Sequence, residues 1–326
     1  MLAFALVAGC ATAPQTKRLV DQPPAGLPER AELEEVPFFP QQRYQCGPAA
    51  LATVLSHLGR DIEPAELVGD VYVPDKQGSL PTEMRAAARA RSTVPYPLAP
   101  RLEALLRELA AGRPVLVMQN LALDWWPRWH YAVAVGYDLA EGVIVLRSGT
   151  QRRRVIGLTV FERTWSRADH WAQVVVGIDD PPATADGLTW LRSVREVERT
   201  AGPAAAAPGY RTATQRWPDR QPGWLARGNN AWDRGEVGRA RAAFRRALEL
   251  EPTSSAAWNN YAHALAADGC AEAGVRAARC ALRIAPDDEA ARDTLEELRS
   301  NGSAAGHAGT CALPACPDPY RGDPER

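Results

Sequence analysis

Lysine and strong net charge are the first features that the sequence lacks. Of its 38 Lys and Arg residues only Lys17 and Lys76 are lysines, and 39 Asp and Glu residues bring the formal net charge to −1. At 326 residues and 46% hydrophobic content, the chain is long enough for about two globular domains. Because no overall field would draw it to a polyanion, we expect no nucleic-acid partner.

A long hydrophobic run is also missing. The N-terminal stretch MLAFALVAGC is far shorter than the ~20 apolar residues that span a bilayer, and no GxxxxGKS/T phosphate-binding motif occurs. This combination argues against an exporter. The stretch ends in Val7-Ala8-Gly9-Cys10, which resembles the lipobox of bacterial lipoproteins.

The lipoprotein resemblance implies a signal peptide over residues 1–9, lipidation of Cys10 and a tether over residues 10–33. Ala11 follows the cysteine where an aspartate would signal inner-membrane retention. The resemblance therefore implies an outer-membrane lipid anchor that faces the periplasm of a bacterial cell envelope, with membrane contact through lipid alone. No Lys or Arg precedes the apolar run, so we expect the true start codon upstream.

Metal-binding cysteine patterns are missing too. No CxxC pair and no His/Cys cluster at ligand spacing occurs, so the sequence predicts no metal site and no cofactor. Six cysteines are present, and an oxidising compartment would let those beyond the lipobox form disulfides. Cys311 and Cys316 could close a small loop in the tail, and Cys270 and Cys280 are close in sequence. Cys46 is then left over as a free thiol.

The central part of the sequence mixes helical and strand patterns. Helical periods of apolar residues occur at 46–58, 80–92 and 101–111. Strand-like runs follow: PVLVMQN, YAVAVGYD, VIVLRS, RRVIGLTV and AQVVVGI. Helices first and an antiparallel sheet afterwards predict an α+β domain over residues 34–178. Residues 179–220, rich in Pro, Gly and Ala, are expected to be a linker with one helix near 187–199.

A repeat follows the expected linker. Trp224 and Trp258, Ala247 and Ala281, Leu248 and Leu282, and Pro252 and Pro286 are each 34 residues apart. This period, with Gly228 and Phe244 at its small and aromatic positions, resembles the tetratricopeptide repeat. We expect all-α repeats at 221–254 and 255–288, a capping helix up to 299 and a flexible tail over 300–326. The resemblance implies binding of a protein partner.

Cys46 stands where a helix is expected to begin. Gly47 and Pro48 follow it, and proline is favoured in the first helical turn because its missing N–H would have no partner there. Backbone N–H groups and the helix dipole at that end would stabilise a thiolate and lower the pKa of the thiol. The apolar positions Leu51, Val54, Leu55 and Leu58 give the helix a face to bury. The pattern favours a reactive cysteine over a buried structural one.

A cysteine nucleophile needs a base, and two of the five histidines are candidates. His130 comes directly before YAVAVGYD and ranks first, because the end of a strand can direct an imidazole toward a helix N-terminus. His170 precedes WAQVVV after an expected loop and ranks second. The other three histidines, His57, His263 and His307, lie in the first helix, the repeats and the tail.

These segments together resemble the bacteriocin-processing (double-glycine type) peptidases, a group of papain-like cysteine peptidases. Cys46-Gly47-Pro48-Ala49-Ala50 and His130-Tyr131-Ala132-Val133 carry the resemblance, which covers roughly residues 36–178. It implies that Cys46 attacks a peptide carbonyl, that His130 moves the proton and that an upstream glutamine donates to the oxyanion. Gln41 matches that glutamine best, with Gln42 and Gln45 as alternatives.

The third catalytic position departs from that family. Its aspartate would fall on the strand after His130, where the sequence reads VIVLRS and Ser148 is the nearest residue. Serine can accept a hydrogen bond from imidazole but brings no charge, and in a serine protease a wrong orienting group can cost ~10⁴-fold in rate. We interpret the adjacent Arg147 as a solvated strand charge rather than a clamp for a substrate carboxylate.

Three tryptophans crowd His130 in DWWPRWH. Trp125, Trp126 and Trp129 either pack into the core and its edges or form an aromatic wall beside a substrate cleft. The sequence leaves both interpretations open.

Two functions follow from these patterns. The first is a lipid-anchored periplasmic cysteine peptidase whose repeats recruit a peptide or protein substrate or another protein partner. The second is an adaptor that binds peptides with little or no catalysis, which the neutral Ser148 favours. Transfer of the acyl group to another amine, in place of water, also stays open.

Overall fold

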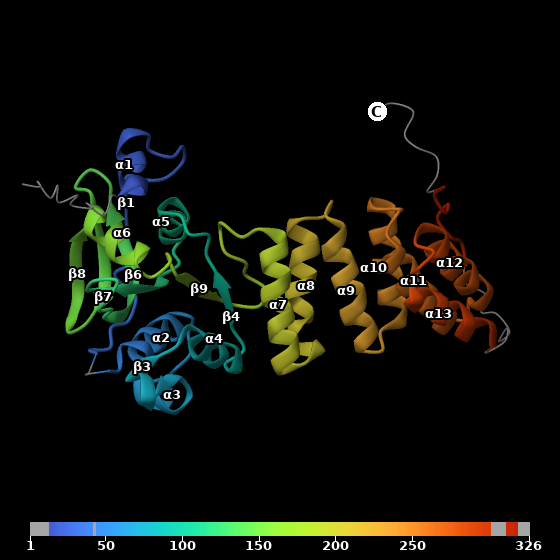
Figure 1. Ribbon diagram of the computed structural model, residues 1–326, viewed down its shortest axis with the longest axis horizontal. Coiled ribbons are helices and arrows are strands. Elements are labelled where there is room, and N and C mark those ends of the chain that lie inside the picture. The colour runs from blue at the N-terminus through green and yellow to red at the C-terminus, as the bar shows by residue number, and fades with distance from the viewer. Residues whose placement is uncertain (1–12, 42–43, 301–310, 319–326) are drawn as a thin grey trace, which may run out of the picture. The chain divides into compact units, whose positions relative to one another are not determined.

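The computed structural model describes residues 13–41, 44–300 and 311–318, and the chain forms two compact units. The first unit runs to Gly177 and includes residues 181–185, and the second comprises residues 178–180 and the chain from Asp186 onward. The expected signal peptide, Cys10, Gln42, His307 and much of the expected tail lie outside the described residues. Figure 1 shows the elements of both units in chain order.

The first unit combines short helices with antiparallel strands. Its helices are α1 (Pro14–Asp21), α2 (Cys46–His57), α3 (Pro64–Val71), the 3₁₀ turn η1 (Pro74–Lys76), α4 (Pro81–Ala90), α5 (Leu102–Ala110) and α6 (Leu158–Ser166). Its strands are β1 (Arg30–Glu32), β2 (Tyr72–Val73), β3 (Gly78–Ser79), β4 (Val94–Pro97), β5 (Val115–Asn120), β6 (Trp129–Asp138), β7 (Val143–Ser148), β8 (Gln151–Gly157) and β9 (Ala172–Val176).

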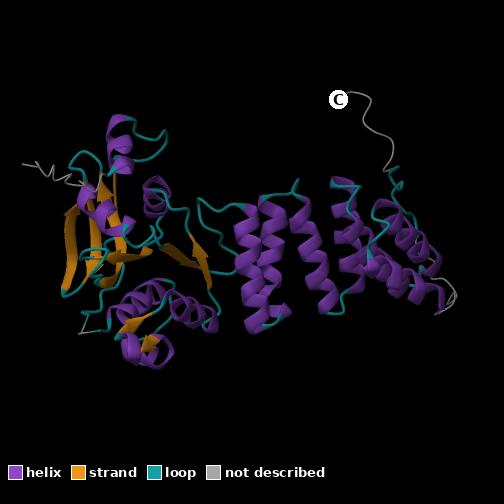
Figure 2. Ribbon diagram, in the orientation of Figure 1, coloured by secondary structure: helices purple, strands orange, loops and turns teal. Residues whose placement is uncertain are grey.

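One antiparallel sheet organises this unit. Its order is β4-β9-β5-β6-β7-β8, and β1 adds to β6. Apolar side chains of the sheet such as Val133 and Val145 pack against Leu51 and Leu55 of α2 in one core. Helices α2, α3 and α4 gather below the sheet in Figures 1 and 2, with α1, α5 and α6 above it. The predicted α+β fold is confirmed.

The segment expected to be a tether is folded instead. Glu162, which is 1% exposed, accepts hydrogen bonds from the backbone N–H groups of Gln15 (2.9 Å) and Thr16 (2.6 Å) at the start of α1. Leu19 of the same helix is buried, and β1 pairs with β6. A carboxylate at a helix N-terminus satisfies donors that have no partner within the helix. The tether prediction is therefore wrong for residues 14–32, because these contacts come from distant parts of the chain.

The run RRVIGLTV, expected to be a strand, changes structure at Gly157. Strand β8 ends there and α6 begins at Leu158. Leu158, Phe161 and Trp165 are all buried, and their spacing of three and four residues places them on one face of a helix. The helical period of these three residues therefore overrides the strand preference of the β-branched residues Thr159 and Val160 at the end of the run.

The second unit is entirely helical. It contains α7 (Gly187–Ala201), α8 (Pro203–Arg216), α9 (Gln221–Asp233), α10 (Val237–Leu250), α11 (Ser255–Ala267), α12 (Ala271–Ile284) and α13 (Glu289–Ser300). The expected all-α repeats are confirmed as helical pairs, and α13 follows them.

The expected linker is a helical hairpin. Trp190 of α7 is buried and its Nε1 donates to the carbonyl oxygen of Gly209 in α8, at 3.0 Å. A Cβ atom on Gly209 would lie 2.7 Å from Val194 Cγ2, so only glycine allows this approach. The Pro-, Gly- and Ala-rich composition suggested an open linker, but Pro203 starts α8 and the small residues let α7 and α8 pack closely.

Glycine also sets the spacing within the first repeat. A Cβ atom on Gly228 of α9 would lie 2.4 Å from the ring of Phe244 in α10, which is 1% exposed. The small and aromatic positions noted in the sequence therefore face one another across the helix pair. Their pairing explains why the repeat uses this combination of residues.

The disulfides differ from the sequence expectation. Cys270 pairs with Cys311, and Cys280 pairs with Cys316. Cys270 is the N-cap of α12 and Cys280 lies ten residues further along the helix, a rise of about 15 Å, which no disulfide can bridge. The described tail residues instead run along α12, where Leu313 packs on the helical core. Cys46 is free, as expected.

Candidate active site

Cys46 is the first residue of α2, and close packing fixes this end of the helix. Residues 47–55 of α2 are all buried, and Gln45 occupies the N-cap. A Cβ atom on Gly47 would lie 2.2 Å from Ser79 Oγ and 2.5 Å from Ser79 Cβ, so the residue after Cys46 must be glycine for β3 to pack here. The expected helix start is confirmed, and its orientation is set by the sheet and by β3.

The thiol of Cys46 lies against the backbone of β6. Backbone hydrogen bonds from Tyr131, Gly47 and Cys46 itself lower the pKa of the thiol, but its burial has the larger effect and raises the pKa overall. The expectation that the helix N-terminus leaves this thiol partly ionised is therefore wrong, because burial outweighs the N–H groups. Tyr131 is the residue directly after His130, so the thiol lies beside the strand that carries the expected base.

His130 is held by the residue at the third catalytic position. Its Nε2 lies 2.8 Å from Oγ of Ser148, which is 2% exposed at the end of β7. Burial first, and then the positive charges of Arg154 and Arg128, lower the pKa of His130 to about 4. The imidazole is therefore neutral at physiological pH, and it is oriented by a neutral hydroxyl.

Gln41 connects the two strands that carry His130 and Ser148. Its Oε1 accepts from the backbone N–H of Gly149 at 2.8 Å, and its Nε2 donates to the carbonyl oxygen of Tyr131 at 3.1 Å. Its own backbone N–H donates to the Gly149 carbonyl oxygen at 2.9 Å. A side-chain amide nitrogen has two N–H donors, so one remains for a substrate oxygen. Of the alternatives, Gln45 is the N-cap of α2 and Gln42 lies outside the described residues.

The tryptophans do not pack in the core. Trp125, Trp126 and Trp129 are 76%, 71% and 53% exposed. Trp125 and Trp126 meet edge to face in the loop before β6, with ring centroids 6.2 Å apart. Trp129 lines a separate cavity with Asn120, Glu162 and Arg167, and strand alternation points it away from the side that His130 uses. The core interpretation is wrong for all three, and Trp129 is not placed as a wall beside His130.

The second candidate base and the neighbouring arginine have other roles. His170 contacts Trp165 edge to face, at 4.7 Å between centroids, and lines the same separate cavity as Trp129. Arg147 is 3% exposed and donates to the carbonyl oxygens of Leu33, Glu34, Val36 and Arg152. It therefore joins the N-terminal segment to the sheet and is not the solvated charge that we expected.

Sequence reasoning missed the charged neighbours of His130. Arg128 and Arg154 act on its charge, and both were visible in DWWPRWH and QRRRV without any signal that they meet at one histidine. Among the residues that the structure describes, no group of three or more His, Cys, Asp or Glu side chains could hold a metal ion.

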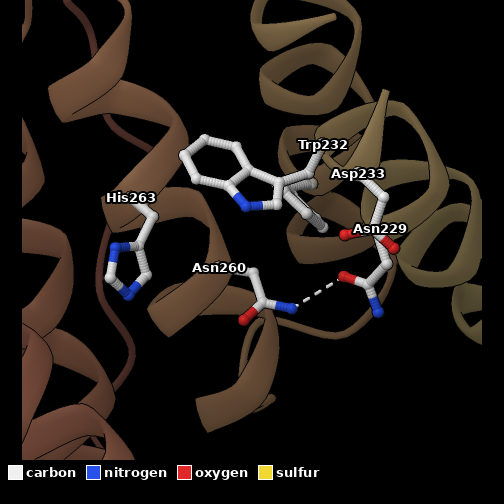
Figure 3. Close-up of a pocket in the computed structure, with 6 residues that line it drawn as sticks. Asn229, Trp232, Asp233, Asn260 and His263 are labelled. Carbon is white, nitrogen blue, oxygen red and sulfur yellow. Dashed lines mark hydrogen bonds between the residues drawn. The ribbon is translucent and has the colours of Figure 1, made fainter. Parts of the chain in front are cut away.

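A cavity lies in the helical unit, shown in Figure 3. It is a cavity of about 300 Å³ between α9, α10 and α11, lined by Asn229, Trp232, Asp233, Phe244, Asn260 and His263. Asn260 Nδ2 donates to Asn229 Oδ1 at 2.8 Å, so equivalent helices of successive repeats are joined by paired amides. This site offers amide, aromatic and acidic groups.

Comparison with protein families agrees with both units. Residues 33–172 match the Peptidase C39 like family and residues 222–264 match the tetratricopeptide repeat. No curated protein matches the chain.

Solved structures show limited likeness. A protein from Bacillus anthracis described as a C39-like peptidase is 18% identical with a TM-score of 0.39, over 46% of this chain and 98% of that one. The first repeat domain of Spaghetti (RPAP3), bound to the HSP90 peptide SRMEEVD, is 14% identical with a TM-score of 0.34, over 35% and 91%. The repeat domain of Arabidopsis OM64 is 13% identical with a TM-score of 0.34, over 36% and 96%. The chain thus contains a Peptidase C39-like domain followed by a tetratricopeptide repeat region.

Proposed function

We propose that this protein is a cysteine peptidase that cleaves peptide bonds with Cys46 and His130. The observation that carries the proposal is the position of the thiol: it accepts the N–H of Tyr131, the residue after His130, while Ser148 holds Nε2 of that histidine. This arrangement leaves Nδ1 of His130 for the thiol proton. The match of residues 33–172 to a peptidase family supports the same chemistry.

The chemistry starts from a neutral pair. His130 Nδ1 takes the proton of Cys46 as Sγ forms a bond to the peptide carbonyl carbon, and the carbonyl electron pair moves to oxygen. The second N–H of Gln41 Nε2 stabilises this oxyanion. Collapse breaks the C–N bond and the imidazolium gives its proton to the leaving amine. Water then hydrolyses the thioester, with His130 again accepting the proton.

Peptide profiling of the purified full chain tests this proposal. We expect the wild type to cleave members of a broad peptide library and Cys46→Ala to cleave none, because the variant lacks the thiol that attacks the peptide carbonyl. Cys46→Ala should keep the same melting temperature within a few degrees, since it removes a half-buried thiol without adding volume. A wild type that cleaves nothing, or equal cleavage by Cys46→Ala, would refute the peptidase proposal.

A non-catalytic peptide-binding adaptor is the second candidate. It is favoured by three observations: the thiol pKa is raised, the pKa of His130 is lowered to about 4, and the orienting Ser148 carries no charge. A resting thiolate is therefore not stabilised. In this function the same library would show binding to wild type and Cys46→Ala alike, without cleavage by either.

The repeats are proposed to bring a protein substrate or partner to the peptidase unit. Tetratricopeptide repeats suggest protein–protein interaction. The cavity between α9, α10 and α11 provides amides that can pair with a peptide backbone and an exposed aromatic surface at Trp232.

We also propose that the protein is lipid-anchored at Cys10 to the outer membrane and faces the periplasm. The Val7-Ala8-Gly9-Cys10 pattern supports the anchor, and two disulfides agree with an oxidising compartment. No helix in the described ranges is long and apolar enough to cross a membrane.

Membrane fractionation tests the anchor. We expect the wild type in the outer-membrane fraction and Cys10→Ser as a soluble or unprocessed protein, with Cys46→Ala as a matched cysteine control that fractionates like the wild type. A Cys10→Ser variant that stays processed and membrane-bound would contradict the lipid anchor.

A further inference from the structure

Two arginines beside His130 have side chains without a partner in the described part of the chain. Arg128 is exposed and lies two residues before His130. Its backbone is engaged, since its N–H donates to Asn120 Oδ1 at 2.9 Å and its carbonyl oxygen accepts from the N–H of Leu121 at 2.9 Å. Arg154 is half-buried on β8, opposite Leu146 of β7, two residues from Ser148. The position of Arg154 on β8, the position of Arg128 beside the start of β6 and the effect of both charges on His130 together place these arginines near the His130 and Ser148 pair.

The other arginines of this part of the sheet are engaged. Arg153 forms a bidentate pair with Glu32, at 2.7 and 2.9 Å. Arg152 donates to the Glu34 carbonyl oxygen at 3.2 Å, and Arg147 is buried among carbonyl oxygens. Among the described arginines of this part of the sheet, the two without a side-chain partner are thus the two that flank His130.

In the described part of the chain, no acidic side chain acts on His130 to balance them. The charges that act on this imidazole come from Arg154 and Arg128, and a third arginine, Arg85 of α4, acts on the buried Tyr131 next to the thiol. A cleft with charges of one sign attracts ligands of the opposite sign. Guanidinium groups bind carboxylates with paired, charge-assisted hydrogen bonds.

We propose that Arg128 and Arg154 form a carboxylate subsite, so that the peptidase prefers substrates with an acidic residue close to the scissile bond. This inference rests on the proposed peptidase function. The bound carboxylate neutralises two positive charges that disfavour the imidazolium, which forms when His130 takes the proton of Cys46. The substrate then supplies negative charge in a site where Ser148 supplies none.

Matched peptides measure this preference with the full chain. Each pair differs only by Glu or Gln beside the scissile bond, and each is made with a free and an amidated C-terminus, which separates a side-chain carboxylate from a terminal one. We expect wild-type kcat/KM to favour Glu by about 10-fold or more at low salt, and the preference to weaken as salt is added. The Arg128→Gln/Arg154→Gln double variant should reduce it to about 2-fold or less.

The matched control is Arg60→Gln. Arg60 is exposed beyond the far end of α2, roughly 18 Å along the helix from Cys46, and should leave the preference unchanged. Arg154→Lys keeps the charge and should retain part of the preference. Equal cleavage of Glu and Gln peptides by the wild type, or a preference that survives the double variant, overturns the carboxylate subsite while leaving the peptidase function standing.

Alkylation of Cys46 tests the same charges without any peptidase activity. The rates of alkylation by iodoacetate and by iodoacetamide are followed by mass spectrometry of the Cys46 peptide. The ratio of the two rates does not depend on the thiolate fraction, because both reagents react with the same thiolate. We expect the ratio to fall about 3- to 10-fold in the double variant and not in Arg60→Gln. If no peptide is cleaved, the peptidase function fails, and an unchanged ratio then also overturns the subsite.

Discussion

His130→Ala should abolish peptide turnover, with kcat lowered on the order of 10⁴- to 10⁶-fold. In the proposed function His130 takes the proton of Cys46, and burial raises the pKa of that thiol. Because a nucleophile and its base act as a unit, the double variant Cys46→Ala/His130→Ala should be no slower than either single variant. Single-turnover cleavage of the best library peptide provides the measurement.

The control for this experiment is His57→Gln. His57 ends α2 and lies at its far end from Cys46, with its Nε2 3.3 Å from the Gly112 carbonyl oxygen. It should keep wild-type turnover. A His130→Ala variant that retains more than about a tenth of wild-type kcat would show that another group accepts the proton.

Ser148→Asp should convert the neutral pair into an ion pair. A carboxylate within hydrogen-bond distance of Nε2 raises the pKa of an imidazole by about 1 to 3 pH units, against the value of about 4 that burial and two arginines give His130. The imidazolium then stabilises the Cys46 thiolate. We expect alkylation of Cys46 at pH 6 to rise about 10-fold or more, and peptide turnover to stay equal or increase.

The pH dependence separates this effect from a structural one. In the folded wild type the pKa of His130 is lowered to about 4 from its ordinary value of about 6.5. As the pH falls, the unfolded chain therefore binds a proton at this histidine before the folded chain does. The free energy of unfolding is thus reduced between about pH 6.5 and about pH 4. Ser148→Asp should shrink that loss, whereas Ser148→Asn, similar in size but neutral, should not. If Ser148→Asp instead lowers the melting temperature at all pH values with no faster alkylation, Ser148 is a packed structural residue and the electrostatic explanation fails.

The sequence named the residues of the candidate site but not the electrostatics of Cys46. The Cys-Gly-Pro start of α2 and the histidine at β6 are short-range patterns, and a family resemblance connects them. The ionisation of Cys46 depends on how much protein surrounds the thiol, which no local pattern contains. Burial therefore reversed the direction expected from the helix N-terminus.

The errors in the fold share one physical cause. Residues 14–21 look like a polar tether until Glu162 accepts their N–H groups, and residues 203–216 look like a linker until α7 packs on them. Likewise, Cys270 and Cys280 are neighbours in sequence but lie on different turns of α12, so the tail supplies their partners.

The sequence by itself determined the α+β domain, the 34-residue helical repeat, the helix start at Cys46 and its free thiol. These depend on periodicity, on proline and glycine, and on the odd count of five cysteines beyond Cys10. Only the tertiary structure decided that Gln41 joins Tyr131 to Gly149, that Ser148 orients His130, and that Arg128 and Arg154 surround it unpaired. Those contacts join residues up to 108 positions apart. Their energies depend on distance and burial in the folded chain, and a pattern along the chain records neither.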